Sequence, residues 1–367
     1  MKILYDHQIF TAQKYGGISR YFYELVHEFD NTQEVQCEIP LLVSNNHYIS
    51  DKKFVNSMDL LPNKQFRGKI RIFNYLNKPN TILKLKQQNF DVFHPTYYDP
   101  YFLTYLGNKP FVLTVYDMIH EKFSDMFSPA DKTTEQKRLL VEKATKIIAI
   151  SQSTKKDLIE FFGTDESKIE VVYLGNSMFP KPNSNIGFEI PKKYLLFVGS
   201  RGGYKNFERF IKSVANLLEQ DKELFVVCAG GGKFGSSEMQ LFSDLGIAGQ
   251  VLQYSLDDES LAYFYKNALA FIFPSLYEGF GIPVLESFAC GCPLICSNTS
   301  SLPEIAGDGA FYFDPYSEES IKNAVLKVLE DVALREDLIT KGQERLKQFS
   351  WKQTAEQTKK IYESVLV

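Results

Sequence analysis

The sequence predicts an α/β protein with two doubly wound parallel sheets, one in each half of the chain. Short apolar runs alternate with amphipathic helical stretches from end to end, which is the pattern of parallel strands connected by helices. A loop-rich segment interrupts this alternation near the middle. The length of 367 residues is more than one ordinary domain needs and is enough for two domains with separate cores.

The predicted strands are short, uninterrupted apolar runs. Strands of a parallel sheet are covered on both faces, so they lack the alternation of a half-exposed strand. In the first half these runs are Ile3–Tyr5, Val92–His94, Phe111–Tyr116, Lys146–Ile150 and Ile169–Tyr173. In the second half they are Tyr194–Val198, Leu224–Cys228, Ala270–Phe273, Pro293–Cys296 and Ala310–Phe313.

Helices are predicted where apolar residues recur at intervals of three and four. One such face consists of Ile18, Tyr21, Phe22, Leu25, Val26 and Phe29. Another consists of Phe207, Phe210, Ile211, Val214 and Leu217. The last segment, Trp351–Leu366, has the same pattern, and Ser350 stands before it as a predicted N-cap.

The break between the two halves is predicted within Met178–Ile190. This segment is rich in residues typical of loops, namely Pro180, Pro182, Asn183, Ser184, Asn185 and Gly187. A new strand follows at Tyr194. We therefore expect one Rossmann-like domain over residues 1–182, a second over residues 183–350, a cleft between them, and a final helix over residues 351–367.

The composition is that of a soluble globular protein, with 44% hydrophobic and 23% charged residues. The net charge of −4 argues against nucleic-acid binding by the molecule as a whole. The N-terminal run Ile3–Tyr5 is too short for the core of a signal peptide, and no apolar stretch is long enough to span a bilayer. We expect a cytoplasmic protein.

Five cysteines are present, and Cys290, Cys292 and Cys296 lie in one short segment. An odd number is not typical of a disulfide framework. Zinc binding by these three is the alternative, but their neighbours are apolar, which favours buried packing thiols in a reducing compartment.

The segment Phe273–Glu286 has the strongest chemical pattern. A strand ends near Phe273, a loop with Gly279 and Gly281 follows, and Pro283 stands at the expected start of a helix, where its missing N–H is not needed. Bare glycine backbone can approach a ligand closely, and a helix N-terminus offers free N–H groups and a positive dipole to an anion. The loop therefore suits a phosphate.

Two carboxylates flank this loop eight positions apart, Glu278 in the loop and Glu286 in the first turn of the predicted helix. Two carboxylates are a poor charge match for a phosphate. They are better suited to accept hydrogen bonds from sugar hydroxyls. The alternative is that Glu286 only complements the helix dipole and Glu278 is a solvated loop residue. The spacing alone leaves both interpretations open.

A second glycine-rich turn, Val198–Asn206, also follows a strand and precedes a helix, where open α/β sheets bind ligands. It begins at Gly199, and its Arg201 and Lys205 add two positive charges suited to a diphosphate. It lacks the full G-x-G-x-x-G dinucleotide pattern. A third turn, Gly16-Gly17, leads into the first helix and is either a cap on the cleft or a plain strand–helix turn.

Taken in order along the chain, these segments resemble the motifs of glycosyltransferase family 4, the retaining enzymes of the GT-B fold. The matching segments are Tyr15–Tyr21, Ile150–Thr154, Gly199–Asn206, Glu278–Glu286, Leu302–Glu304 and Phe349–Trp351. One segment would be a weak signal, but several in the right order extend over nearly the whole chain. The resemblance implies a mannosyltransferase-like hexosyltransferase of the GT-B fold, with two Rossmann-like domains that face a central cleft and a C-terminal helix that crosses back to the N-terminal domain. It also implies that residues 1–182 form the acceptor-side domain and residues 183–350 the nucleotide-sugar-binding domain.

The resemblance also implies a site for a nucleotide-sugar donor. Arg201 and Lys205 would neutralise the donor diphosphate. Glu286 would accept hydrogen bonds from the ribose, and Glu278 would contact the transferred sugar. The other implied donor contacts come from Gly16, Gly17, Gly199, Gly279, Phe280, Gly281, Ile282 and Pro283.

One position departs from the family pattern. Many members have a His-Asp pair at the end of the strand that here is Phe111–Tyr116, whereas this chain has Tyr116-Asp117, with His120 close by. Three interpretations stay open: Tyr116 contacts the transferred sugar, His120 takes that role, or the role is not essential. Tyr116, Asp117 and His120 join Glu278, Arg201 and Lys205 as the candidate catalytic residues.

By the same resemblance, the leaving diphosphate helps to deprotonate the acceptor, and the protein stabilises the diphosphate and the oxocarbenium-like sugar. The chain has no Asp-x-Asp pair, and we expect transfer without a metal ion or other cofactor. GDP-mannose is the first expected donor, ahead of UDP-hexoses and dTDP-rhamnose. The expected acceptor is a glycan or lipid-linked glycan of surface polysaccharide synthesis.

Residues 60–90 form a basic stretch in an otherwise acidic protein. They contain no Asp or Glu, and apolar residues are interleaved with Lys64, Arg67, Lys69, Arg71, Lys78, Lys84 and Lys86. Such a stretch can bind anionic lipid, or it can be an ordinary solvated helix face. Peripheral contact with the cytoplasmic face of a membrane therefore stays open.

Two other functions compete with sugar transfer. A sugar-nucleotide epimerase of the same fold would turn over free donor without acceptor, but the Glu278–Glu286 block does not resemble its pattern. A non-catalytic sugar-nucleotide sensor would bind donor tightly without transfer or hydrolysis, and Tyr116 is the feature that favours it.

Overall fold

The structure is a computed structural model that describes residues 1–49, 55, 57, 58, 66, 68–180 and 189–366. The chain forms two compact α/β units, and the predicted fold class is confirmed. Unit 1 contains residues 1–174 and 350–367, and unit 2 contains residues 175–349. The boundary predicted after residue 182 lies outside the described residues.

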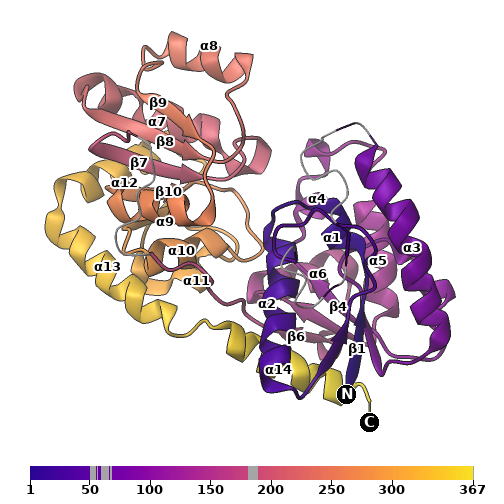
Figure 1. The fold of residues 1–367 in the computed structure, drawn as a ribbon. Coiled ribbons are helices and arrows are strands. Elements are labelled where there is room, and N and C mark those ends of the chain that lie inside the picture. Colours follow the sequence, from indigo (N-terminus) through magenta and orange to yellow (C-terminus); the bar gives the residue numbers. More distant parts are fainter. Residues whose placement is uncertain (50–54, 56, 59–65, 67, 181–188, 367) are drawn as a thin grey trace. The chain divides into compact units, whose positions relative to one another are not determined.

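Unit 1 is built on short parallel strands with helices packed around them (Figure 1). The strands are β1 (Lys2–Tyr5), β2 (Gln36–Glu38), β3 (Val92–His94), β4 (Val112–Val115), β5 (Lys146–Ala149) and β6 (Ile169–Val171). They form two sheets, β2-β1-β3 and β4-β5-β6, which a bridge between Phe93 and Phe111 connects. The helices are α1 (Gln8–Ala12), α2 (Gly17–Thr32), α3 (Lys69–Gln87), α4 (Ile119–Lys122), α5 (Thr133–Lys143), α6 (Gln152–Phe162) and α14 (Trp351–Ser364).

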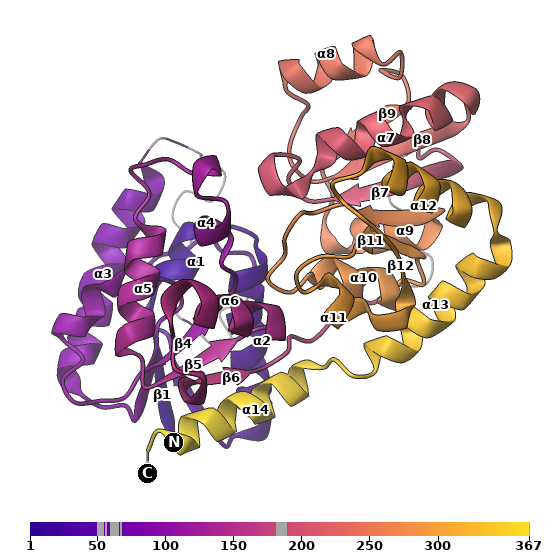
Figure 2. The same cartoon turned by 180° about the vertical axis from the view of Figure 1, so that it is seen from behind.

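The last helix, α14, returns to unit 1 and packs beside α2, as both views show (Figures 1 and 2). Ser350 is its N-cap, as predicted, and its hydroxyl accepts a hydrogen bond from the amide of Gln353 at 3.2 Å. The buried Tyr362 hydroxyl lies 3.0 Å from the hydroxyl of Tyr5 and 2.6 Å from Nδ1 of His94. The helix is thereby attached to β1 and β3.

Unit 2 has one parallel sheet in the order β12-β11-β10-β7-β8-β9. This is the strand order of a Rossmann fold, and the order reverses between β7 and β10. The strands are β7 (Lys193–Val198), β8 (Leu224–Ala229), β9 (Val251–Tyr254), β10 (Ala270–Phe273), β11 (Leu294–Ser297) and β12 (Ala310–Phe313). The helices are α7 (Phe207–Gln220), α8 (Ser236–Asp244), α9 (Asp258–Asn267), α10 (Ile282–Ala289), α11 (Leu302–Ala306), α12 (Glu318–Glu330) and α13 (Val332–Leu346).

The core of unit 2 contains the predicted apolar face of α7. All five residues of that face are buried, and the rings of Phe197 on β7 and Phe207 on α7 meet edge to face with centroids 4.9 Å apart. Helices α7 and α12 pack side by side against the sheet. The strands under the candidate site are therefore rigidly supported.

Two strands, β2 and β9, are not among the predicted ones. Both lie at the edge of their sheet, and their side chains are largely half-buried or exposed. A partly solvated strand does not need a continuous apolar run, so the pattern that revealed the inner strands is missing from these two.

Candidate functional site

The candidate donor site lies in unit 2, at the carboxyl ends of β7 and β10. These two strands are neighbours in the sheet, and the strand order reverses between them. Ligands of open α/β sheets bind in the crevice that such a reversal creates. The two loops that the sequence analysis singles out, one after each strand, therefore meet at one edge of the sheet.

The two loops are joined directly to each other. The amide of Leu276 donates to the carbonyl oxygen of Tyr204 at 2.7 Å, and Nζ of Lys205 donates to Oε1 of Glu278 at 2.6 Å. The side chains of Lys205 and Glu278 are only 17% and 11% exposed, so water screens their attraction weakly. The structure thus brings together a cation and a carboxylate that are 73 positions apart in the chain.

Asn206 holds the Lys205 turn in place. Its backbone is left-handed, with φ of 59°, a conformation that asparagine tolerates better than most residues. Its side-chain amide donates to the carbonyl oxygens of Pro274 at 3.0 Å and Pro315 at 2.8 Å. The turn after β7 is therefore fastened to the loops after β10 and β12.

Helix α10 begins where the Glu278 loop ends. Its N-cap, Gly281, has φ of 95°, and a Cβ there would also lie 3.0 Å from Cδ2 of Leu302, so the turn requires glycine. The helix begins at Ile282, so Pro283 is its second residue and Glu286 lies in its second turn, which corrects the prediction by one residue. The amide of Val284 already donates to the carbonyl oxygen of Gly281 at 2.9 Å. What the start of α10 offers the loop is the positive end of the helix dipole.

Glu286 is held by a residue that the sequence analysis missed. The side chain is almost fully buried, and the hydroxyl of Tyr265 on α9 donates to its Oε2 at 3.2 Å. Burial, reinforced by the Glu286 carboxylate, raises the pKa of Tyr265 well above its ordinary value, so the hydroxyl keeps its proton. Tyr265 is a positioning residue, and the sequence of α9 does not distinguish it from an ordinary core aromatic.

A third loop, after β11, supports the Glu278 turn. The amide of Glu278 donates to Oγ of Ser300 at 2.9 Å. Oγ of the buried Ser301 donates to the carbonyl oxygens of Glu278 at 2.9 Å and Phe280 at 3.0 Å. These bonds fix the backbone from Glu278 to Phe280, where the family resemblance expects sugar hydroxyls.

The side chain of Arg201 forms hydrogen bonds with the segment that follows β8. Its Nε donates to Oε1 of Glu238 at 2.6 Å, a residue 37 positions away. Its other nitrogens donate, at 3.0 to 3.2 Å, to the carbonyl oxygens of Gly230, Gly232 and Lys233. The structure therefore assigns Lys205 to the Glu278 loop and Arg201 to residues 230–238.

The Arg201 contacts depend on a neighbouring glycine. Gly231 has φ of 68°, and a Cβ there would lie 2.6 Å from Nη1 of Arg201. Burial alone would raise the pKa of Glu238, but hydrogen bonds from Arg201 and from the amide of Gly235 lower it below its ordinary value. A cavity of about 1080 Å³ opens beside this ion pair, a volume sufficient for a nucleotide.

In unit 1, Gly16 and Gly17 form the start of α2. Gly16 is the N-cap, and a Cβ on it would collide with Oε1 of Gln13. That same oxygen accepts a hydrogen bond from the amide of Ser19 at 3.2 Å. Gln13 thus caps α2, and Gly16 leaves the space for its side chain.

Tyr116 and Asp117 directly follow β4. Tyr116 is 6% exposed, and its hydroxyl donates to the carbonyl oxygen of Thr96 at 3.3 Å. Oδ1 of Asp117 accepts the amide of Ile119 at 3.1 Å, which closes a local turn. The structure thus places the Tyr116 hydroxyl in the core of unit 1 and the Asp117 carboxylate at the strand end.

His120 lies one turn further along. Its ring stacks on Phe127 with centroids 3.9 Å apart, and its Nε2 lies 3.6 Å from Oδ2 of Asp131. Its Nδ1 is buried and has no hydrogen-bond partner among the described residues. Close by, Nζ of the fully buried Lys137 donates to Glu121 at 2.8 Å and to the Asp117 carbonyl oxygen at 2.9 Å, an ion pair that the sequence analysis missed.

The three clustered cysteines are buried, as predicted. Burial raises the pKa of the Cys290 thiol to about 12 and that of Cys292 and Cys296 further. These thiols therefore stay protonated and act as small apolar side chains. In the part of the chain that the structure describes, no group of three or more His, Cys, Asp or Glu is placed to hold a metal ion.

Comparison with protein families gives a match for each half of the chain. Residues 15–176 match the family described as Glycosyltransferase Family 4, and residues 183–345 match the family described as Glycosyl transferases group 1. The second range contains both loops of the candidate donor site.

Known relatives include two mannosyltransferases. The chain is 28% identical over 250 residues to O-antigen chain mannosyltransferase B of Escherichia coli, which covers 64% of this chain and 66% of that protein. It is 27% identical over 217 residues to O-antigen chain mannosyltransferase RfbU of Salmonella typhimurium, which covers 59% of this chain and 60% of that protein. The chain thus matches somewhat less than two thirds of either relative's length.

Solved structures of similar fold cover the whole chain. Sucrose-phosphate synthase from Thermosynechococcus elongatus has a TM-score of 0.76 and 18% identity, over 99% of this chain and 98% of that one. HepE of Anabaena, solved in complex with UDP and glucose, has a TM-score of 0.77 and 16% identity, over 99% of this chain and 100% of that one. These neighbours confirm the predicted GT-B fold, in which two Rossmann-like domains follow each other in the chain.

Proposed function

This chain belongs to the glycosyltransferases of family 4, and from that premise we propose that it transfers a hexose from a nucleotide-sugar donor to a glycan or lipid-linked glycan. The observation that carries the proposal is the pair of Lys205 and Glu278 at the strand-order reversal of unit 2, beside the start of α10. A half-buried cation and a helix N-terminus attract a diphosphate. A neighbouring carboxylate accepts hydrogen bonds from sugar hydroxyls.

The donor would take over part of the present hydrogen bonding. Its diphosphate would lie between Nζ of Lys205 and the N-terminal end of α10, and Glu278 would turn from Lys205 to the transferred sugar. Glu286, oriented by Tyr265, would accept hydrogen bonds from the ribose. Arg201 would act through the segment 230–238, which it holds at the edge of the adjacent cavity, and add positive charge to the diphosphate's surroundings.

Transfer would proceed with retention of configuration and without a metal ion. The bond between the anomeric carbon and the diphosphate oxygen breaks, and the diphosphate oxygen takes the proton of the acceptor hydroxyl that attacks the same face. Lys205 and the positive end of the α10 dipole would stabilise the negative charge that develops on the leaving group. Asp117, Tyr116 and His120 remain the candidates in unit 1, with Gly16 and Gly17 as further donor contacts.

The names of the relatives support mannose as the transferred sugar. Both E. coli mannosyltransferase B and Salmonella RfbU are named for O-antigen chains. We propose GDP-mannose as the donor and surface polysaccharide synthesis as the process.

A thermal-shift panel of GDP, UDP, dTDP and ADP, followed by the matching sugar nucleotides, tests this proposal. A ligand that binds only the folded state raises the melting temperature according to its affinity. At a ligand concentration 100 times its Kd, the free energy of unfolding increases by about 2.7 kcal/mol. We expect GDP and GDP-mannose to raise it most. A shift from none of the nucleotides would overturn the donor site.

Helix α3 and the residues before it are proposed to contact an anionic membrane. Residues 60–65 and 67 of the predicted stretch lie outside the described residues. On α3, Ile70, Ile72 and Tyr75 are 50%, 47% and 80% exposed, and Arg71 is exposed among them. Apolar and basic side chains together on one helix suit the lipid interface. Of the helices in the described part of the chain, none combines the length and apolar character needed to cross a bilayer.

Co-sedimentation with liposomes tests this contact. The bound fraction should rise when anionic lipid replaces neutral lipid, because each basic residue near an anionic surface contributes about 1 kcal/mol. Tyr75→Glu should reduce binding, whereas Tyr316→Glu, at an exposed tyrosine of unit 2, should leave it unchanged. Equal binding to neutral and anionic vesicles would refute the proposed contact with an anionic membrane.

A further inference from the structure

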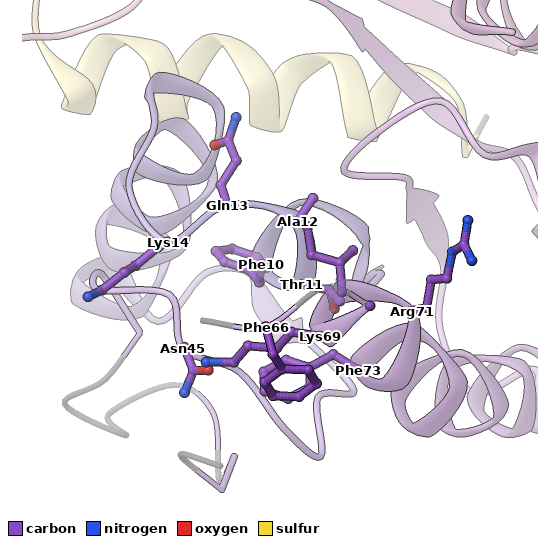
Figure 3. A pocket seen from close by; sticks show the side chains of 12 residues that line it. Phe10, Thr11, Ala12, Gln13, Lys14, Asn45, Phe66, Lys69, Arg71 and Phe73 are labelled. Carbon is purple, nitrogen blue, oxygen red and sulfur yellow. The ribbon is translucent and has the colours of Figure 1, made fainter. Parts of the chain in front are cut away.

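The side chain of Arg201 is buried, although the family resemblance expects it to meet the donor diphosphate. Only 4% of this side chain is exposed, and its Cζ lies 4.7 Å from the centre of the Phe234 ring. A cavity of about 780 Å³ in unit 1 has a different arrangement: Arg71 on its lining is exposed and extends away from the rings of Phe66 and Phe73 (Figure 3). A ligand reaches Arg201 only if a neighbouring group moves.

Glu238 is the neighbour of Arg201 that is best able to move. Its Oε1 lies 2.6 Å from Nε of Arg201, and its Oε2 lies 3.4 Å from Nη2. The Glu238 side chain is 24% exposed, so it can turn to solvent without remaining a buried charge. The carbonyl oxygens of Gly230, Gly232 and Lys233, which hold Nη1 and Nη2, belong to the backbone. Departure of Glu238 alone would therefore uncover Nε and leave the arginine in place.

The carboxylate of Glu238 neutralises a charge that would otherwise be costly. A buried arginine without a counter-ion destabilises a folded protein, so the ion pair stabilises the donor-free state. A diphosphate carries more negative charge than a carboxylate, and its oxygens suit the paired N–H groups of a guanidinium. Glu238 and a diphosphate are thus competing partners for the same side of Arg201.

The cavity of about 1080 Å³ in unit 2 connects this ion pair to the donor loops. Arg201 and Glu238 line it together with Asn206 and Leu276. Asn206 directly follows Lys205, and Leu276 lies in the loop that continues to Glu278. A ligand in this cavity therefore has access to the ion pair and to the donor loops.

Glu238 also caps helix α8. Its Oε2 accepts a hydrogen bond from the amide of Gly235 at 2.7 Å, as part of a capping box. Phe242 is the buried residue of this helix, and the preceding residues 230–232 are all glycine, whose backbone adjusts easily. Movement of the Glu238 side chain would therefore loosen the start of α8.

We propose that Glu238 is a positioning residue of the donor site, the counter-ion that holds Arg201 until the donor diphosphate displaces it. In the donor-free protein its carboxylate occupies Nε of Arg201 and caps α8. When the diphosphate arrives, Glu238 turns to solvent and a phosphate oxygen takes its place at Nε, while the backbone carbonyl oxygens keep the guanidinium in position. This inference rests on the proposed function and adds a residue that the proposed donor chemistry does not use.

Isothermal titration calorimetry of the full chain with GDP and with UDP tests the inference. Glu238→Gln keeps an oxygen for Arg201 and a residue type that completes a capping box, but it removes the charge that competes with the diphosphate. We expect the variant to bind the nucleotide that the wild type prefers about tenfold more tightly, because the donor then breaks a neutral hydrogen bond instead of a charged one. Guanosine and uridine, which lack phosphate, should bind the two proteins equally.

The matched control is Glu344→Gln, which removes the same charge from an exposed position of α13 whose partner is Lys347. It should change nucleotide affinity by less than about twofold. A purely structural role of Glu238 predicts the opposite result for Glu238→Gln, namely unchanged or weaker binding.

Hydrogen–deuterium exchange of the wild-type protein provides a test without a variant. A ligand ordinarily slows exchange around its site, but displacement of Glu238 removes the acceptor of the Gly235 amide. GDP or UDP should therefore speed exchange in a peptide that contains the start of α8, residues 235–238.

Unchanged or weaker nucleotide binding by Glu238→Gln, an equal gain for the nucleosides, or unchanged or slower exchange at the start of α8 would each overturn the inference. If the wild type binds a nucleotide when one of these results appears, the donor site stands and only the role of Glu238 falls. If neither nucleotide binds the wild type, the donor site and this inference fall together.

Discussion

Replacing Lys205 by alanine is expected to lower kcat/KM for sugar transfer by about 100- to 1000-fold. Lys205 is the cation that the fold holds at the strand-order reversal of unit 2, bonded to Glu278 at 2.6 Å and only 17% exposed. Removing it leaves the departing diphosphate with one fewer charge to stabilise it, and leaves the Glu278 carboxylate without its partner. Steady-state kinetics with GDP-mannose and a glycan acceptor would measure the loss.

The matched control is Lys222→Ala, which removes the same charge from an exposed turn of unit 2. It should retain activity within about twofold. Arg201→Ala is a less direct test, because loss of its bonds to Glu238 and three carbonyl oxygens would also loosen residues 230–238. Wild-type activity in Lys205→Ala protein that melts normally would refute the assignment of Lys205.

Lowering the pH from 6.5 to about 3 is expected to destabilise unit 1 strongly through His94. Burial lowers the pKa of His94 from 6.5 to about 3. Its Nδ1 lies 2.6 Å from the Tyr362 hydroxyl and its Nε2 2.9 Å from Oγ1 of Thr114, with no water-exposed surface. The folded protein therefore holds this imidazole neutral.

The sign of the effect follows from linkage. Between pH 6.5 and 3 the unfolded chain binds a proton at this position and the folded chain does not, so the stability contribution is complete above pH 6.5 and is lost as the pH falls. The slope is about 1.4 kcal/mol per pH unit and the total about 4 to 5 kcal/mol. The free energy of unfolding, from urea denaturation at a series of pH values, would show this dependence.

A variant without a titratable group at position 94 distinguishes the pH dependence caused by His94 from that of the carboxylates that titrate in the same pH range. His94→Gln should be less stable at pH 7 but should lose stability less steeply on acidification. As a check that does not need the variant, the His94 ring signals in NMR should stay constant from pH 8 to 5. Identical slopes for the two proteins, or a His94 titration near pH 6.5, would contradict the prediction.

The sequence by itself determined the inner strands, the helices α2, α7, α10 and α14, and the position of the donor loops. Strands such as β1, β7 and β10 are covered on both faces, so their residues form continuous apolar runs that predict a strand. The glycine-rich loop that contains Glu278 could also be predicted, because the left-handed backbone at position 281 favours glycine. These features depend on residues that are close together in the chain.

The tertiary structure alone decided which partners the functional side chains have. Nothing local indicates that Arg201 bonds to Glu238, that Tyr265 holds Glu286, or that residues after β1 and β2 close a cavity with the start of α3. The edge strands β2 and β9 were hidden for a related reason, since their partly solvated side chains need no apolar run. The periodicity of apolar residues reflects how far each segment is buried. A contact between segments that are distant in the chain depends instead on the order of the strands in the sheet.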